Sequence, residues 1–139
     1  WSSEHGRSVG ASGYDEINRI IPGGNYGWPH SEGDTVLSDT VAPTRHSTAD
    51  VTWAPGGLAF YGNSLYMPGL RGETLYEAVL ENDEIVGWRE HLVGTYGRLR
   101  TVAVGPDGFL YVTTSNRDGR GDTPDEHDDR ILRIDPTQL

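Results

Sequence analysis

The residues best suited to chemistry in this 139-residue sequence are carboxylates and arginines. Six carboxylates crowd the stretch 118–129, "DGRGDTPDEHDD": Asp118, Asp122, Asp125, Glu126, Asp128 and Asp129. Carboxylates this dense can hold Ca²⁺, although their spacing does not match a helix–loop–helix calcium site. The alternative interpretation is a solvated surface loop, because charged side chains are mostly exposed.

Arginine supplies all 11 basic residues, in a chain of net charge −10. A dominant negative field argues against a nucleic-acid partner, which requires a basic stripe. Arg71 in "GLRG" and Arg98 and Arg100 in "RLR" would form a local positive spot if they met on one rim. Such a spot suits a carboxylate ligand, because guanidinium groups pair bidentately with carboxylates. Each arginine alone could instead form a surface salt bridge.

Several other chemistries are excluded. There is no cysteine, and hence no thiol catalysis and no disulfide. The sequence lacks the serine-hydrolase, P-loop and H-E-x-x-H motifs. No zinc site is expected, because ligand spacing is missing among His5, His30, His46, His91 and His127. No apolar run is long enough to predict a membrane span. We interpret the "RGD" at 120–122 as a chance match.

Short strands and tight turns must position the candidate residues. High glycine and proline content favours strands and turns over helices. Turns such as "GN", "END" and "PDG" are typical of antiparallel neighbours, and the strands predicted around them are 57–62, 64–69, 73–80, 84–93, 100–105, 109–115 and 130–135. The opening "WSSEHG…DEINRII" is interpreted as a second strand, a loop and a third strand of the same plan.

The strand plan repeats, with Tyr66 and Tyr111 lying 45 residues apart in matching stretches. A period of about 40–50 residues with four strands per unit is typical of a β-propeller. We therefore predict an all-β fold of about two and a half four-stranded antiparallel blades. Residues 1–50 would form part of one blade and a connection, 51–95 a whole blade, and 96–139 most of another. A closed propeller needs more blades, so we expect a C-terminal fragment of one propeller domain. An ordinary antiparallel β-sandwich is the alternative fold.

Three stretches, in this order, resemble the soluble aldose dehydrogenases that use pyrroloquinoline quinone (PQQ), including soluble glucose dehydrogenase and the glucose/sorbosone dehydrogenase-like proteins. They are "SEHG…DEINRIIPGGNYGWP", "VTWAPGGLAFYG" and "GRLRTVAVGPDGFLYVTTSNRDGRG", and the resemblance runs from about residue 2 to 136. It implies a six-bladed propeller, with this chain as part of blade four, blade five and most of blade six. It also implies oxidation of an aldose at the anomeric carbon, by hydride transfer to the quinone with Ca²⁺ assistance. An external electron acceptor and a periplasmic or secreted location are implied as well.

The resemblance implies a set of cofactor-binding residues beneath a quinone that lies over one face. Arg98 and Arg100 match paired arginines that face the quinone and its carboxylates, and Arg100 is the candidate oxyanion stabiliser. Ser115 stands where soluble glucose dehydrogenase has an aspartate. The remaining matches are a polar contact, a hydroxyl near a cofactor carboxylate and a basic position: His5, Thr52 and Arg71.

The resemblance also implies metal ligands. A Ca²⁺ would bridge the quinone to the main-chain carbonyls that match Gly6 and Arg7, with Asp15 as an acidic residue under the same loop. Arg7 stands where most relatives have proline. A second Ca²⁺, found in some relatives, would be held by Glu16 and by the backbone near Tyr26. The alternative is that Tyr26 and its neighbour Trp28 plug the base of a blade.

Topology gives a check on these residues that does not use the family. In a four-stranded blade, the loop after the second strand and the loop between blades share one face. The strand plan therefore puts the turns "GN", "END" and "PDG" on one face, and on the other His5, Gly6, Arg7, Thr52, Arg71, Arg98, Arg100 and Ser115. Strand alternation also predicts that Arg98 and Arg100 share one side of their strand, with Leu99 opposite.

No residue here matches the family's catalytic histidine, which belongs to an earlier blade. We therefore expect the parent protein to be a dehydrogenase and this chain alone to be inactive. It should expose blade edges unless missing N-terminal blades or another chain cover them. Two other functions remain open: a non-catalytic propeller module that binds carbohydrate or protein, and a structural β domain stabilised by calcium in the 118–129 loop.

Overall fold

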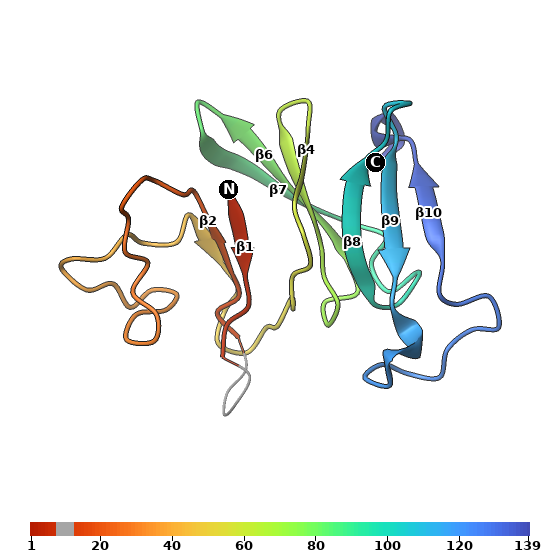
Figure 1. Cartoon of the computed structure of the whole chain (residues 1–139), viewed down its shortest axis with the longest axis horizontal. Coiled ribbons are helices and arrows are strands. Elements are labelled where there is room, and N and C mark those ends of the chain that lie inside the picture. The colour runs from red at the N-terminus through yellow and green to blue at the C-terminus, as the bar shows by residue number, and fades with distance from the viewer. Residues whose placement is uncertain (8–12) are drawn as a thin grey trace.

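The computed structural model describes residues 1–7 and 13–139, which form three antiparallel sheets standing side by side (Figure 1). The first sheet contains β1 (Ser2–Glu4), β2 (Glu16–Asn18) and β3 (Arg45–His46). The second contains β4 (Ala59–Tyr61), β5 (Ser64–Pro68), β6 (Leu75–Glu81) and β7 (Glu84–His91). The third contains β8 (Leu99–Val104), β9 (Leu110–Thr114) and β10 (Ile131–Ile134). Two short 3₁₀ helices cover Asn116–Asp118 and Pro136–Gln138, and nothing helical in the described ranges could cross a membrane.

The predicted all-β antiparallel fold is confirmed. The sheets stand beside one another like blades, not as two facing layers, which argues against the β-sandwich alternative (Figure 1). The repeat is visible in the pairing. Tyr66 and Tyr111 both lie on the second strand of their sheet, and each pairs with an alanine of the first strand, Ala59 and Ala103 respectively.

Local turn chemistry explains the meander within the middle sheet. Asn82 and Asp83 connect β6 to β7 as a two-residue loop, and both have positive φ angles, of 52° and 63°. Positive φ at both central positions is the mark of a type I′ turn, whose twist matches that of the flanking strands. Strand β5 is buried along its whole length, because it lies inside the sheet with both faces covered.

Strand β3 is absent from the strands predicted by the sequence. It has only two residues, and they pair with Glu16 and Ile17 of β2. Its neighbourhood, "VAPTRHST", shows none of the alternation that predicts a strand. The long connection from β2 returns to the sheet at this point, so tertiary pairing, and not local preference, makes the strand.

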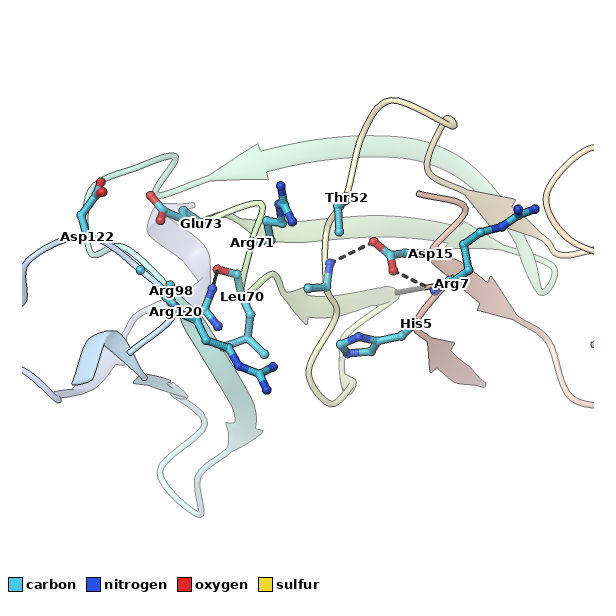
Figure 2. A pocket seen from close by; sticks show the side chains of 13 residues that line it. His5, Arg7, Asp15, Thr52, Leu70, Arg71, Glu73, Arg98, Arg120 and Asp122 are labelled. Carbon is cyan, nitrogen blue, oxygen red and sulfur yellow. Dashed lines mark hydrogen bonds between the residues drawn. The ribbon is translucent and has the colours of Figure 1, made fainter. Parts of the chain in front are cut away.

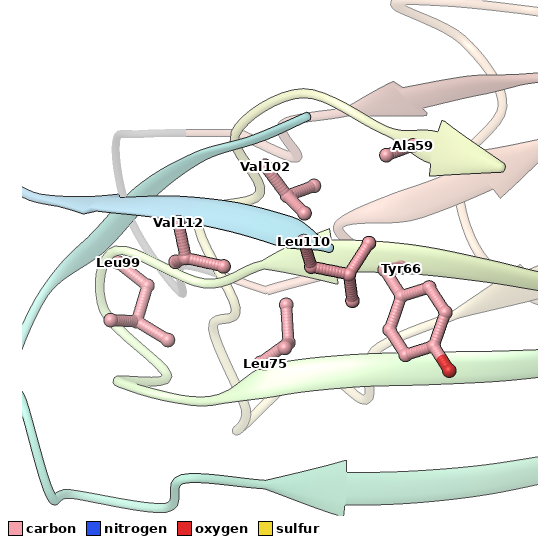
Figure 3. Close-up of a cluster of buried hydrophobic side chains, with 7 residues drawn as sticks. All are labelled: Ala59, Tyr66, Leu75, Leu99, Val102, Leu110 and Val112. Atoms are coloured by element: carbon pink, nitrogen blue, oxygen red, sulfur yellow. The ribbon is translucent and has the colours of Figure 1, made fainter. Parts of the chain in front are cut away.

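Apolar side chains hold the three sheets together. Between the second and third sheets lies a buried cluster of Ala59, Tyr66, Leu75, Leu99, Val102, Leu110 and Val112 (Figure 3). On the other side of the middle sheet, Ile17 packs with Trp53, Met67 and Tyr76. The Trp53 ring lies 5.5 Å from Tyr76 and 5.2 Å from Trp88 between ring centroids. Both faces of the middle sheet are thus fixed against a neighbour, which sets the positions of the connecting loops.

The two outer sheets each end in a strand with one neighbour among the described residues. β1 pairs only with β2, and β10 pairs only with β9. Ile131 on β10 is 72% exposed. The hairpin turns β4–β5, β6–β7 and β8–β9 gather at one end of the sheets, the upper end in Figure 1, and the loops β5–β6, β7–β8 and β9–β10 lie toward the lower end, while the long β2–β3 connection extends to the side of the first sheet.

Candidate functional site

Loops from all three sheets line one pocket of about 590 Å³ (Figure 2). That volume is within the usual range for a small-molecule site. The first sheet contributes His5, Gly6, Arg7 and Asp15; the second contributes Thr52, Ala54, Leu70, Arg71 and Glu73; and the third contributes Arg98, Arg120, Gly121 and Asp122. Seven of the residues singled out from the sequence therefore meet here: His5, Gly6, Arg7, Asp15, Thr52, Arg71 and Arg98.

Asp15 organises the wall of the pocket between the first and second sheets. Its Oδ1 accepts the Gly6 N–H at 2.9 Å, and its Oδ2 accepts the N–H groups of Trp53 and Ala54 at 2.6 and 2.9 Å. The side chain is buried, with the residue 2% exposed. These three amides occupy both carboxylate oxygens, so the structure gives Asp15 a positioning role. Its predicted contact with Ca²⁺ stays a prediction.

His5 adjoins a residue that Asp15 holds, and Ala54 is held by Asp15 directly, since Asp15 accepts the N–H groups of Gly6 and Ala54. His5 Nε2 lies 2.8 Å from the Pro55 carbonyl oxygen. A carbonyl only accepts hydrogen bonds, so Nε2 carries the proton, and in the neutral ring Nδ1 remains an acceptor. Ala54 has a φ of 47°, in the left-handed region that favours glycine. Its carbonyl accepts the Leu70 N–H at 2.9 Å, which helps to hold this strained conformation.

Gly6 and Arg7 both line the pocket. No hydrogen bond from another described residue reaches the carbonyl oxygen of either residue. Glycine is required at position 6, because a Cβ there would lie 1.8 Å from the carbonyl oxygen of Gly13. The Arg7 side chain turns to Glu32, with Nε 3.0 Å from Oε2. Carbonyl oxygens are suitable ligands for a hard cation such as Ca²⁺.

Arg98 and Arg100 share one carboxylate. Asp118 Oδ2 lies 2.9 Å from Arg98 Nη2 and 3.1 Å from Arg100 Nη2. Arg98 also donates from Nη1 to the Leu70 carbonyl oxygen at 3.2 Å and is 8% exposed, whereas the Arg100 side chain is 48% exposed. The hydrogen bonds from Arg98 hold the pKa of Asp118 below its usual value. The two arginines thus reach the same carboxylate from just before β8 and from the bulge at Arg100, so the bulge and not simple alternation brings them together, while Leu99 is fully buried.

Comparison with known proteins identifies the chain's family. The family model described as "Glucose / Sorbosone dehydrogenase" matches residues 1–132. The chain belongs to the glucose/sorbosone dehydrogenase family.

Solved structures of similar proteins agree with this family. The PQQ-bound form of aldose sugar dehydrogenase from Streptomyces coelicolor is 40% identical, with a TM-score of 0.81 over 96% of this chain and 38% of that one. A Thermus thermophilus protein, provisionally described as a glucose dehydrogenase, is 47% identical, with a TM-score of 0.84 over 95% of this chain and 40% of that one. The aldose sugar dehydrogenase YliI of Escherichia coli K12 is 28% identical over 98% of this chain and 38% of its own length. The chain therefore spans about two fifths of these relatives, as part of a propeller.

The acidic loop of this glucose/sorbosone dehydrogenase chain is tied to arginines. Arg130 pairs with Asp125 at 2.7 Å, and Arg117 donates from Nη2 to the Asp125 and Glu126 carbonyl oxygens at 3.2 Å. Asp129 Oδ1 accepts the Asn116 N–H at 2.6 Å. Within the described ranges, no group of three or more histidine or acidic side chains is placed to hold a metal ion. The loop is more ordered than a simple solvated loop, and it carries Arg120, Gly121 and Asp122 into the pocket.

Sequence reasoning missed the roles of Asp118 and Arg120 in this family member. The sequence places Asp118 in a charged surface stretch, and its arginine partners lie 18 and 20 residues earlier. Arg120 is hidden within the "RGD" match. One signal is present: Asp118 follows three residues after Ser115, a position singled out from the sequence. The Ser115 hydroxyl lies 3.5 Å from Asp118 Oδ2. The carboxylate that binds the two arginines is therefore supplied three residues after Ser115.

Glu16 and Tyr26 line a second pocket of about 190 Å³, which shares His5 and Gly6 with the first. Glu16 accepts the Gly33 N–H at 2.9 Å and the Asn18 amide at 3.2 Å. The Tyr26 hydroxyl donates to the Arg19 carbonyl oxygen at 2.7 Å and accepts the Ile21 N–H at 2.9 Å. Tyr26 therefore holds the backbone that follows β2. Trp28 is 64% exposed, so the structure does not support the alternative in which it fills the base of a blade. The second calcium site stays a prediction.

Proposed function

We propose that this chain is the C-terminal part of a PQQ-dependent aldose sugar dehydrogenase. The enzyme would oxidise the anomeric carbon of a sugar by hydride transfer to the quinone, with Ca²⁺ assistance. One observation carries the proposal: Gly6, Arg7 and Arg71 line one pocket in an acidic chain, and over the described residues no hydrogen bond reaches the two carbonyl oxygens or the Arg71 guanidinium. Oxygen ligands suit Ca²⁺, and a guanidinium suits a carboxylate.

The residues present fit such a cofactor. PQQ supplies the redox chemistry when bound, and Ca²⁺ acts as a Lewis acid beside it. The Gly6 and Arg7 carbonyls would hold the calcium, and Asp15 keeps their loop in place through the Gly6 N–H. Arg71 would bind a cofactor carboxylate.

Four further residues have proposed parts around the same ligand. The His5 ring and the Thr52 hydroxyl offer polar contacts from the pocket wall. Arg100 stays the candidate oxyanion stabiliser, held near the site through Asp118. The Ser115 hydroxyl supports the Asp118 carboxylate, with 3.5 Å between its oxygen and Asp118 Oδ2.

The chain does not supply the whole reaction. No histidine of this sequence matches the context of the family's base, and we propose that this base comes from blades outside the chain. Residues 1–50, 51–95 and 96–139 would then represent part of blade four, blade five and most of blade six. An aldose, an external electron acceptor and a periplasmic or secreted location belong to the same proposal.

The test uses the full-length protein that contains this chain. After removal of metal, we expect PQQ and Ca²⁺ together to restore aldose-dependent reduction of an electron-accepting dye, and residues 1–139 alone to show none. Activity of the isolated chain on glucose with quinone and Ca²⁺ would contradict the proposed division of labour. A full-length protein that binds sugar but ignores quinone would instead support a non-catalytic binding module.

A further inference from the structure

Arg71 and Arg120 differ from the other arginines of this chain. Across residues 1–7 and 13–139, theirs are the only guanidinium groups without a hydrogen bond, ion pair or ring contact. The others contact acids, carbonyl oxygens or a ring: Arg7 with Glu32, Arg19 with Asp83, Arg45 over Trp88, Arg89 with Glu77, Arg98 and Arg100 with Asp118, Arg117 with loop carbonyls, Arg130 with Asp125, and Arg133 with Asp107. Both unpaired arginines line the same pocket.

The loop after β9 is built to present Arg120. Asp118 Oδ1 accepts the Arg120 N–H at 3.0 Å, while its Oδ2 binds Arg98 and Arg100. Gly119, between them, has a φ of 75° and allows the sharp turn. Gly121 packs so closely on Arg98 that a Cβ there would lie 2.6 Å from Arg98 Cδ. Figure 2 shows the Arg120 side chain reaching from this loop into the pocket.

Asp118 thereby separates the arginines of the site into two groups, those whose guanidinium contacts its carboxylate and those whose guanidinium does not. Arg98 and Arg100 share its single carboxylate, which offsets one of their two charges and ties both side chains to the wall. Arg71 and Arg120 keep their full charge, one from the second sheet and the other from the third. Asp15, Glu73 and Asp122 line the same pocket, so the two cations lie among carboxylates, and an acidic group of a ligand would be attracted locally by each unpaired guanidinium.

We propose that Arg120 is an anion-binding residue of this pocket, which holds one acidic group of the ligand while Arg71 holds another. The ligand chemistry is that of a compact molecule with several carboxylates. Its identification as PQQ rests on the proposed function. Arg120 contacts the ligand directly, whereas Asp118 is a positioning residue that acts through the loop.

The experiment measures ligand binding by the full-length, metal-reconstituted protein. PQQ is titrated against tryptophan fluorescence at low and high NaCl for the wild type, Arg120→Gln, Arg120→Lys and Arg19→Gln. Arg19→Gln removes the same charge from an exposed pair with Asp83, outside the pocket. We expect Arg120→Gln to weaken binding at least tenfold and to reduce its salt dependence, Arg120→Lys to recover part of the loss, and Arg19→Gln to stay within twofold of wild type.

Each outcome decides between the two proposals. Binding of PQQ by Arg120→Gln within twofold of wild type, with an unchanged melting temperature, would overturn the role of Arg120. If the wild type ignores PQQ, the same titration is made with citrate by calorimetry. If citrate binds the wild type and this binding is lost in Arg120→Gln, the anion-binding role of Arg120 would stand and the proposal that the ligand is PQQ would be rejected. Failure of the wild type to bind either anion would overturn both proposals.

Discussion

Asp15 and Ala54 lie 39 residues apart in the chain, and the Ala54 N–H donates to Asp15 Oδ2 at 2.9 Å. This bond joins the loop that follows the first sheet's opening strand to the loop that precedes the middle sheet. Because Ala54 has a φ of 47°, the hydrogen bond holds a conformation that alanine rarely adopts. The pocket wall therefore depends on one buried carboxylate.

Replacement of Asp15 by asparagine should destabilise the fold. The substitution puts an NH₂ group where a carboxylate oxygen accepts backbone N–H groups, so at least one buried donor loses its partner. We expect a loss of about 1.5–3 kcal/mol in the free energy of unfolding, as for hydrogen bonds to charged groups. Denaturant unfolding measures it, with the exposed Asp39→Asn as the control, expected within about 0.5 kcal/mol of wild type. Equal stability of the two variants would contradict the role of Asp15.

Two adjacent glycines should respond differently to alanine. A Cβ at Gly56 would lie 1.8 Å from the Arg100 carbonyl oxygen, whereas a Cβ at Gly57 would meet nothing within 4 Å. Gly56→Ala must therefore push the second and third sheets apart locally, at a cost of about 1–3 kcal/mol. Gly57→Ala should change stability by less than about 0.5 kcal/mol. Thermal unfolding of the pair checks the prediction, and similar shifts for both would refute the close approach.

Truncation of Leu75 should weaken the packing between the second and third sheets. Leu75 is fully buried in the cluster that joins them. Leu75→Ala should lose about 2–5 kcal/mol, from lost transfer energy and from the cavity left behind. Val86→Ala on β7 removes apolar atoms from a side chain that is 58% exposed, and should lose much less. Chemical denaturation of both variants would reveal whether the two sites differ.

Glu77 should make stability depend on pH. Burial alone would raise the pKa of this carboxyl, but hydrogen bonds from Ser64, His91 and Arg89 outweigh burial and lower the pKa from its usual 4.5. The ionised Glu77 therefore adds stability that is fully present above pH 4.5 and is lost as pH falls through the folded-state pKa.

Unfolding between pH 3 and 6 tests this effect. Glu77→Gln should be less stable than wild type near neutral pH, and the difference should shrink below about pH 4.5. Glu81→Gln, at the exposed end of the same strand, controls for net charge. A constant difference across the range would show that Glu77 acts through shape alone.

The fold is more predictable from the sequence than the site is. Period and turn chemistry predict the middle sheet, because Asn82 and Asp83 specify their turn locally. Alternation predicts Arg98 and Arg100 on one side of their strand, but Arg98 precedes β8 and Arg100 lies in a bulge that the sequence does not announce. The partners of these arginines are not predictable, since Asp118 reaches them only after the loop folds back. The same holds for Asp15, whose three amide donors come from positions 6, 53 and 54.

The pocket takes its walls from three separate sheets, which has a consequence for the unliganded protein. A ligand that contacts loops from each sheet would add to the apolar packing and the few hydrogen bonds, such as Ala54 N–H to Asp15 Oδ2, that join these units. A ligand bound in the pocket therefore stabilises the folded protein, and by mass action the melting temperature rises with ligand concentration. In a cell that is short of ligand, the protein would be less stable and proteases would cleave it more readily.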